Sequence, residues 1–121
     1  MTIATKTART LQTSGSNSAG ATATGTAVDL RTAVGDFLVT SVIVNGATGP
    51  TVGCDFIVQV SVDSSTWRQY ARMTAGTTNS TTYTFAVLVP ASCLYVRSVF
   101  TGNTGQAVTV AAEGHEYSGI A

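Results

Sequence analysis

The sequence predicts an all-β fold, an antiparallel β-sandwich of seven or eight strands. Turn-forming residues recur about every 8 to 12 positions, a spacing typical of sandwiches and barrels. The runs between them are rich in Val, Ile, Thr, Phe and Tyr, and several alternate apolar with polar residues, which is the period of a strand with one buried face. No long window shows the apolar period of a capped amphipathic helix.

The composition favours one domain that associates with other proteins. The chain has 121 residues, enough for one core and too few for two. It is 44% hydrophobic but only 10% charged, with a formal net charge of +0. Because no summed field attracts phosphates or anionic lipid, nucleic acid and membranes are not expected partners. Ser and Thr make up roughly a quarter of the chain, and a surface so poor in charge is weakly protected against association.

The N-terminal segment, residues 1–26, is expected to differ from a single sandwich domain at 27–121. Residues 2–11 have strong β-propensity, whereas 12–26 contain no large apolar side chain and add little to a core. We therefore expect 12–26 to be a flexible loop or an arm that a neighbouring subunit orders. The alternative is that residues 2–11 complete the protein's own sheet. A signal peptide is not expected, because the first ten residues contain no apolar run of sufficient length.

The middle of the chain contains the clearest strands. A short run at 27–30 is followed by FLVTSVIV at 37–44, which is almost uniformly apolar and predicts a buried central strand. Residues 54–63 alternate most cleanly and place Cys54, Phe56, Val58, Val60 and Val62 on one face. A polar turn then leads into an alternating run at 67–73, which predicts a hairpin.

Three further strands are expected in the C-terminal part. They cover residues 81–89, ended by Pro90, then 94–100 and 107–113, and a short tail with His115 and Tyr117 follows. The predicted core consists of the residues that alternate toward one side of these strands: Phe56, Val58, Val60, Trp67, Phe85, Val87, Val96 and Val110.

The two cysteines, Cys54 and Cys93, lack the spacing of a zinc site or of a disulfide-rich scaffold. We expect both to be buried, reduced thiols that behave as small hydrophobic residues.

Two segments resemble the galactose-binding-like, or discoidin-type, jelly roll. In VQVSVDSSTWRQY (58–70), a strand ends near Ser61 and Asp63 and turns through small residues to Trp67. In LVPASCLYVRSVF (88–100), a Pro-small-small segment leads into a Tyr-Val-Arg strand. The resemblance covers about a third of the chain, concerns scaffold residues and implies a jelly-roll-like sandwich. The chain is shorter than a complete domain of that family.

The whole chain is also similar to small virion proteins of tailed bacteriophages, among them capsid decoration or cement proteins and tail or baseplate modules. The shared features are Thr-, Ala- and Gly-rich strands, little charge, and loops such as NGATGPT and TGNTGQA. This resemblance implies an oligomeric component of a shell or tail.

One stretch offers a candidate binding surface. Trp67, Arg68 and Tyr70 could form a glycan platform, because an aromatic face stacks on sugars while Arg binds hydroxyls. Strand alternation, however, places Trp67 opposite Tyr70, so we expect Trp67 in the core. Arg68 and Arg72 alternate in phase with Tyr70, and we interpret Arg68, Tyr70 and Arg72 as interface residues, together with His115 and Tyr117.

Catalytic and metal-binding patterns are weak. His115 is the sole histidine, and the acidic residues show no pairing that suits acid–base chemistry. Asp63 follows a strand as a calcium ligand would, but no calcium-loop motif surrounds it, and we expect a carboxylate that closes the turn. We therefore expect no enzyme activity, no cofactor and no metal.

The sequence favours a structural virion protein of a tailed bacteriophage, assembled in the host cytoplasm. The first hypothesis is an oligomeric capsid decoration or cement protein that contacts copies of itself and the major capsid protein. The alternatives are a tail, neck or baseplate structural protein, and a carbohydrate-binding module on a tail tip or fibre.

Overall fold

The computed structural model describes residues 4–31 and 35–120. The described residues form nine strands and one 3₁₀ helix. In chain order these are β1 (Ala4–Asn17), β2 (Ala23–Thr24), β3 (Val28–Asp29), β4 (Phe37–Asn45), β5 (Asp55–Ser61), β6 (Arg68–Thr74), β7 (Thr82–Val89), η1 (Ala91–Cys93), β8 (Tyr95–Thr101) and β9 (Val108–Ile120). Within residues 4–31 and 35–120, no helix is long and apolar enough to cross a membrane.

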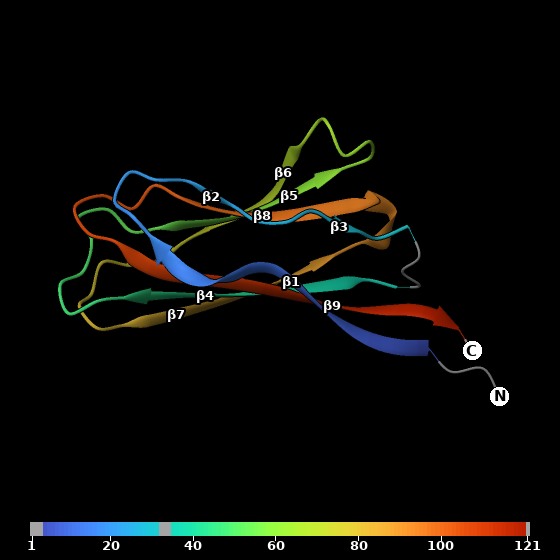
Figure 1. The fold of residues 1–121 in the computed structure, drawn as a ribbon, viewed down its shortest axis with the longest axis horizontal. Coiled ribbons are helices and arrows are strands. Elements are labelled where there is room, and N and C mark those ends of the chain that lie inside the picture. Colours follow the sequence, from blue (N-terminus) through green and yellow to red (C-terminus); the bar gives the residue numbers. More distant parts are fainter. Residues whose placement is uncertain (1–3, 32–34, 121) are drawn as a thin grey trace.

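The strands form two layers (Figure 1). One sheet has the order β1-β9-β4-β7, and the other has the order β2-β8-β5-β6 with β3 also paired to β8. All the strand pairs are antiparallel. Four sets of them are nested in sequence: β1 with β9, β2 and β3 with β8, β4 with β7, and β5 with β6. This arrangement confirms the predicted all-β antiparallel sandwich, and its jelly-roll-like character stays a prediction. The strand count exceeds the expected seven or eight because β2 and β3 are two short pieces along one edge of β8.

The core lies between the two sheets. Phe56 is fully buried and packs against Phe100 and Phe85, with ring centroids 5.3 and 6.4 Å away. Of the predicted core residues, the structure buries Phe56, Val58, Val96 and Val110 and places Val60, Phe85 and Val87 half-buried against the core. Alternation therefore identified the inward face of four strands, β5, β7, β8 and β9. The prediction of a core position for Trp67 is wrong, since Trp67 is half-buried beneath Arg97.

The β4 strand differs from its apolar sequence. Its residues alternate between buried and outward-facing positions, so Leu38 and Val42 are each 37% exposed. The expectation of a strand buried on both faces is therefore wrong, because nothing in the described chain covers this side of the sheet. On its inner side, Phe37 packs so closely on Gly114 that a Cβ there would lie 1.9 Å from the Phe37 ring. Glycine is required at position 114.

The N-terminal segment is part of the sandwich. Residues 4–17 form β1, which pairs with β9 along its length. The expectation of a loop or arm at 12–26 is therefore wrong for residues 12–17. Leu11 is 1% exposed within the core. Main-chain pairing with β9, which composition does not reveal, satisfies the backbone of this polar strand. The division of the chain at residue 26 stays a prediction.

The last strand is longer than expected. The sequence indicated a strand at 107–113 followed by a tail, but β9 continues to Ile120 and includes His115. The extension exists because β1 and β4 flank β9 on both sides, with His115 opposite Ala8 and Leu38.

Candidate interaction surfaces

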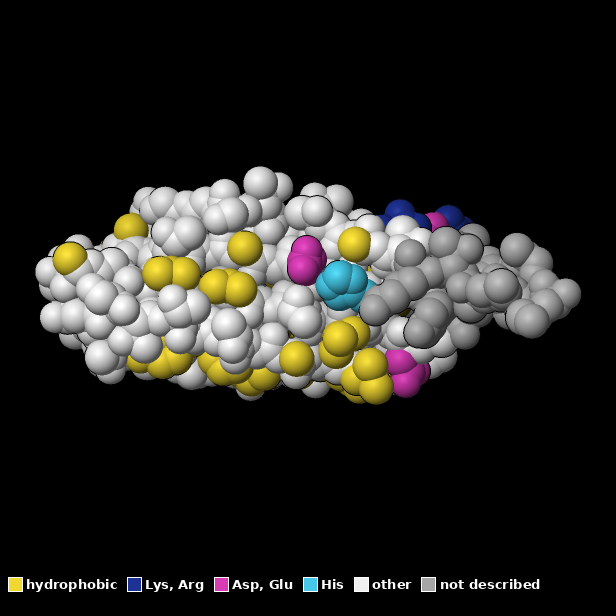
Figure 2. Space-filling model, turned by 90° about the horizontal axis from the view of Figure 1, so that it is seen from below, with side chains coloured by type: hydrophobic (Ala, Val, Ile, Leu, Met, Phe, Trp, Pro, Cys, Tyr) yellow, Lys and Arg dark blue, Asp and Glu magenta, His cyan; other side chains and the backbone are white. Residues whose placement is uncertain are grey.

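The outer side of the β1-β9-β4-β7 sheet carries very little charge. We call the outward-facing residues of β4, β7 and residues 108–116 of β9 the low-charge face. They are mainly Thr, Ala, Val and Leu, and Glu113 and His115 are the titratable ones among them. Figure 2 shows this side as mostly white and yellow, with the histidine and one acidic side chain near its middle. Leu88 is 55% exposed on this face.

Two hollows mark the low-charge face, and Thr40 lines both. The first, of about 430 Å³, lies where β1, β9 and β4 meet. The second, of about 620 Å³, lies at the other end of β4. The first is lined by Thr10, Gln12, Thr13, Ser14, Thr40, Val42, Ala111, Ala112 and Glu113, and the second by Gly35, Asp36, Leu38, Thr40, Leu88, His115 and Glu116. The lining of the first is mostly hydroxyl and small apolar side chains, whereas Asp36, His115 and Glu116 add titratable groups to the second.

His115 belongs to this face, where its Nε2 lies 3.5 Å from Oε1 of Glu113. The next residue, Glu116, points the other way and is buried, and its Oε1 accepts hydrogen bonds from Nε and Nη2 of Arg9 at 2.9 and 2.7 Å. His115 is partly exposed on this face, and its interface role stays a prediction. The side chain of Tyr117 lies outside the described part of the chain.

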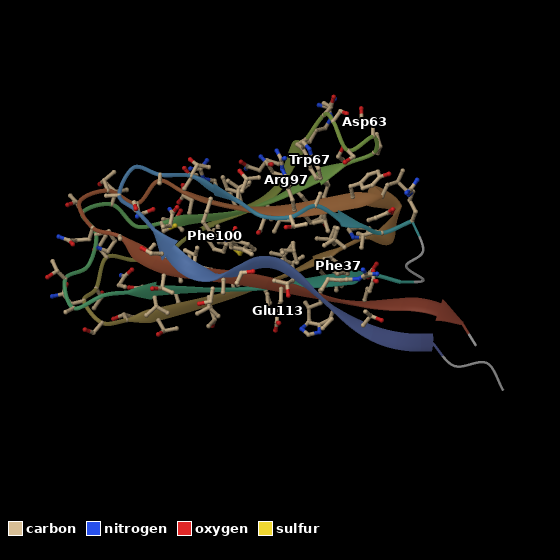
Figure 3. The ribbon with its side chains drawn as sticks, viewed as in Figure 1. Phe37, Asp63, Trp67, Arg97, Phe100 and Glu113 are labelled. Carbon is tan, nitrogen blue, oxygen red and sulfur yellow. The ribbon has the colours of Figure 1, made fainter. Side chains whose placement is uncertain are left out.

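The outer side of the other sheet carries arginines in fixed contacts. We call Arg31, Arg72 and Arg97 with their partners the arginine face. The Arg97 guanidinium lies 4.2 Å from the centre of the Trp67 ring, and its Nε donates to Gln59 Oε1 at 2.8 Å. Figure 3 shows Trp67 and Arg97 together on the outside of this sheet, away from Phe100 in the core.

The remaining arginines of this face pair with carboxylates. Arg72 Nη2 and Thr74 Oγ1 both donate to the carboxylate of Asp55, which is 8% exposed. Arg31 donates to the Asp29 carboxylate from its main-chain N–H, its Nε and its Nη2, and its guanidinium lies 5.5 Å from the centre of the Tyr95 ring. The hydrogen bonds from Arg31 hold the pKa of Asp29 below its ordinary value. These cations are engaged within the chain.

A bulge in β6 changes the predicted phase of this strand. Val58 pairs with Ala71 but Gln59 with Gln69, so Tyr70 is an extra residue between them. The Tyr70 hydroxyl reaches the opposite sheet and donates to the carbonyl of Leu88 at 3.3 Å.

The in-phase grouping of Arg68, Tyr70 and Arg72 is therefore wrong. Arg72 lies on the arginine face, Tyr70 spans the edge of the sandwich, and Arg68 lies opposite Val60. Arg68 lines a third hollow of about 340 Å³ beside Cys93. The interface role of each residue stays a prediction, but they do not form one patch.

Trp67 is not a core residue. It lies just before β6, is half-buried, and covers part of the outer side of the sheet beneath Arg97. Alternation failed because residue 67 precedes the regular strand, and the bulge shifts the phase after it. Trp67 and Tyr70 do not share a platform, so the arrangement proposed for a glycan is not present.

Asp63 closes the turn between β5 and β6. Its Oδ1 accepts hydrogen bonds from the main-chain N–H of Thr66 at 2.8 Å, the N–H of Ser65 at 2.9 Å and the hydroxyl of Ser61 at 2.9 Å. These hydrogen bonds keep the pKa of Asp63 below its ordinary value, and the bond from Thr66 contributes most. The turn interpretation of Asp63 is confirmed.

The two cysteines are free thiols. Cys54 is buried, and burial raises the pKa of its thiol to about 11. Cys93 is half-buried, and burial raises its pKa too. No cluster of three His, Cys, Asp or Glu side chains occurs among the residues that the structure describes.

No protein-family model matches the chain, and no curated protein sequence is significantly similar to it. Solved structures share its fold. The PBSX exported protein XepA matches 93% of this chain and 37% of its own at a TM-score of 0.67 and 13% identity. A structure of the Gx strain of infectious bursal disease virus matches 94% of this chain and 33% of its own, with a TM-score of 0.58 and 14% identity. A chain from the disulfide-linked pili of Bacillus endospore appendages matches 96% of this chain and 90% of its own, with a TM-score of 0.54 and 11% identity.

The chain thus spans about a third of the length of the first two structures and nearly all of the third. At these identities the likeness shows the fold.

Proposed function

We propose that this protein is a structural component of the virion of a tailed bacteriophage, most specifically an oligomeric decoration or cement protein that binds major capsid subunits. It acts by covering surface between subunits, without a chemical reaction. A clamp of this kind stabilises a shell when it buries on the order of 1,000 Å² or more across a subunit boundary.

The low-charge face carries the proposal. Leu38, Val42 and Leu88 are 37%, 37% and 55% exposed there, with threonines between them. Covering such a surface removes few charges from water, so the desolvation cost is low and the burial of apolar area is favourable. The hollows on both sides of Thr40 offer recesses for side chains of a partner.

The fold also supports a structural role in an assembly. It occurs in an exported protein of PBSX, in infectious bursal disease virus and in pili of Bacillus endospores. Two of these three are parts of protein assemblies by their own description, and a sandwich with one bare face suits such use.

The location of the protein in purified particles tests the proposal. Virions are disrupted, heads and tails are separated on a gradient, and the protein is quantified in each fraction by mass spectrometry. A constant number of copies in the head fraction supports decoration. Copies in the tail fraction alone overturn decoration and favour a tail, neck or baseplate role, and absence from both fractions overturns the virion role.

A matched pair of variants tests which face binds. Thr40→Lys adds a charge to the low-charge face, and Thr24→Lys adds the same charge to an exposed strand position of the other sheet. We expect Thr40→Lys to lower occupancy on heads and Thr24→Lys to leave it unchanged. Equal occupancy of both variants contradicts binding through the low-charge face.

A further inference from the structure

The edge strand β7 differs from the other sheet edges of this molecule. In the described chain β7 pairs with β4 alone, over eight residues without a bulge or a charged side chain. The other edges are interrupted, since β1 has three register shifts, β2 and β3 have two residues each, and β6 has a bulge and two arginines. Such interruptions keep sheet edges from pairing with other chains, and β7 has none of them.

Two hydrogen bonds show which main-chain groups of β7 face the open edge. The carbonyl of Thr81 faces β4, because it accepts from the N–H of Asn45 at 2.9 Å. The carbonyl of Leu88 faces away from β4, because it accepts from the hydroxyl of Tyr70 on the other sheet. Main-chain groups alternate sides along a strand. The N–H and C=O groups of Thr82, Thr84 and Ala86 therefore all face the open edge.

These groups are self-complementary. If a second copy of β7 lies antiparallel with Thr84 opposite its own counterpart, Thr82 lies opposite Ala86 in both directions. Each facing pair then exchanges two hydrogen bonds. The outward side chains at this seam are small and uncharged, so no like charges meet at the twofold axis.

The side chains beside the seam also favour a second copy. Tyr83 and Phe85 point to the core side of β7 and remain half-buried. In the same register, Tyr83 of one copy lies opposite Phe85 of the other, an aromatic pair across two strands that stabilises sheets. Tyr70 occupies the carbonyl of Leu88 and marks one end of the available edge.

We infer that two copies of this protein join through β7, antiparallel about a twofold axis at Thr84, so that their β1-β9-β4-β7 sheets form one continuous sheet. Strand addition of this kind obtains affinity from main-chain hydrogen bonds, and twofold contacts are the commonest in homo-oligomers. The inference deepens the proposed function, since the low-charge faces of the two copies would become one surface. It does not require that the partner be a capsid.

Charge variants at the axis test the inference. Thr84→Lys and Thr84→Glu each place like charges opposite one another, whereas a mixture of the two places opposite charges there. We expect the full-length protein to elute as a dimer by size-exclusion chromatography with light scattering. Each single variant should elute as a monomer, and the equimolar mixture as a dimer. Thr24→Lys, on the other sheet, should stay dimeric.

A cysteine variant tests the register without depending on charge. Residues in a hydrogen-bonded antiparallel pair have Cα atoms about 5.5 Å apart, within the range of a disulfide. Thr84→Cys should therefore form a covalent dimer on mild oxidation, and Thr24→Cys should not. Circular dichroism of every variant checks that the sandwich is folded.

The inference is overturned if the wild-type protein is monomeric at its highest soluble concentration, or if folded Thr84→Lys stays dimeric. It is equally overturned if folded Thr84→Cys forms no covalent dimer, or if Thr24→Cys forms one as readily. None of these results bears on whether the protein is found in heads or tails, so failure of the dimer and failure of the virion role are distinguishable.

Discussion

The two outer sides of this sandwich treat their apolar residues differently. On the arginine side, Ile57 and Val99 point outward but are each only 7% exposed, and Ile57 lies between Val99 and Arg72 in the sheet. Long arginine stems cover apolar surface while their charged ends stay in water. On the low-charge face, Leu88 is 55% exposed, and no arginine of the described residues lies on this face to cover it. The apolar residues of the first side are thus covered within the described chain, whereas those of the second are exposed to solvent.

Removal of residues 1–26 should have the largest effect on both sides. It deletes β1 and β2, exposes the edge of β9 and takes Leu11 out of the core. We expect the truncated chain to lose its cooperative thermal unfolding transition, measured by circular dichroism, and to regain it when a peptide of residues 1–26 is added. A truncated chain that melts cooperatively would restore the interpretation of this segment as a separate arm.

The core beneath both sides gives the next largest effect. Phe56→Ala removes a fully buried ring that contacts Phe85 from one sheet and Phe100 from its own. We expect the free energy of unfolding to fall by about 3 to 5 kcal/mol, the range for truncation of a core aromatic residue. Denaturant unfolding measures it, and Leu88→Ala, exposed on the low-charge face, is the control with little change. Comparable losses for both would contradict the placement of the core.

One acidic residue on each side sharpens the comparison. Asp55→Ala leaves the Arg72 guanidinium and the Thr74 hydroxyl without their shared acceptor, and we expect a loss of about 1 to 3 kcal/mol. Glu113→Ala removes a carboxylate that makes a 3.5 Å approach to His115 on an open surface, and the change should stay within about 0.5 kcal/mol. Chemical denaturation of the two variants measures both. Equal losses would show that the sides are not different in this respect.

Arg97 offers a smaller and more local test. Trp67 is the one tryptophan of the sequence, so its fluorescence reports this contact alone. Arg97→Ala should shift the emission to longer wavelength as the ring meets water, and lower stability by about 0.5 to 1 kcal/mol. Arg97→Lys keeps a cation and should shift the emission less. An unchanged spectrum in Arg97→Ala would contradict the stacking.

The smallest effect concerns pH. The pKa of Asp63 is lower in the folded protein than in the unfolded chain, so its ionised form stabilises the fold above the unfolded pKa of 3.8. This contribution is lost as the pH falls through the lower, folded pKa. Melting temperatures between neutral and acid pH should fall less steeply for Asp63→Asn than for the wild type. Parallel curves would show that the turn does not depend on this charge.

The sequence predicted the parts of the fold that depend on local alternation. The strands from 37 to 100 and the burial of Phe56, Val58 and Val96 follow from period-two patterns and turn residues. It left open whether residues 2–11 join the protein's own sheet, and it did not predict that β1 continues to Asn17. That strand is held by main-chain pairing with β9 near the other end of the chain.

The site depended on features with no local signal. The extra residue in β6 has the same composition as a regular strand, yet it sends Tyr70 across the sandwich edge and separates Arg68 from Arg72. The partner of Trp67 comes from β8, thirty positions along the chain, where only the folded sheet brings Arg97 above the ring. The composition predicted a surface with little charge, but it did not predict which of the two sheets would carry the low-charge face.

The nested pairing of the strands has a kinetic consequence. Arg72 and Asp55, in the innermost pair, are 17 residues apart in sequence, whereas Arg9 and Glu116, in the outermost pair, are 107 apart. The entropy lost on closing a loop grows with its length, and folds built from distant pairs form slowly, in milliseconds to seconds. The β5–β6 hairpin should therefore form first and the β1–β9 pair last. Until that last pair closes, β1 is unpaired and β9 has one open edge, and a nascent chain among many others is most prone to pair with the wrong neighbour at that stage.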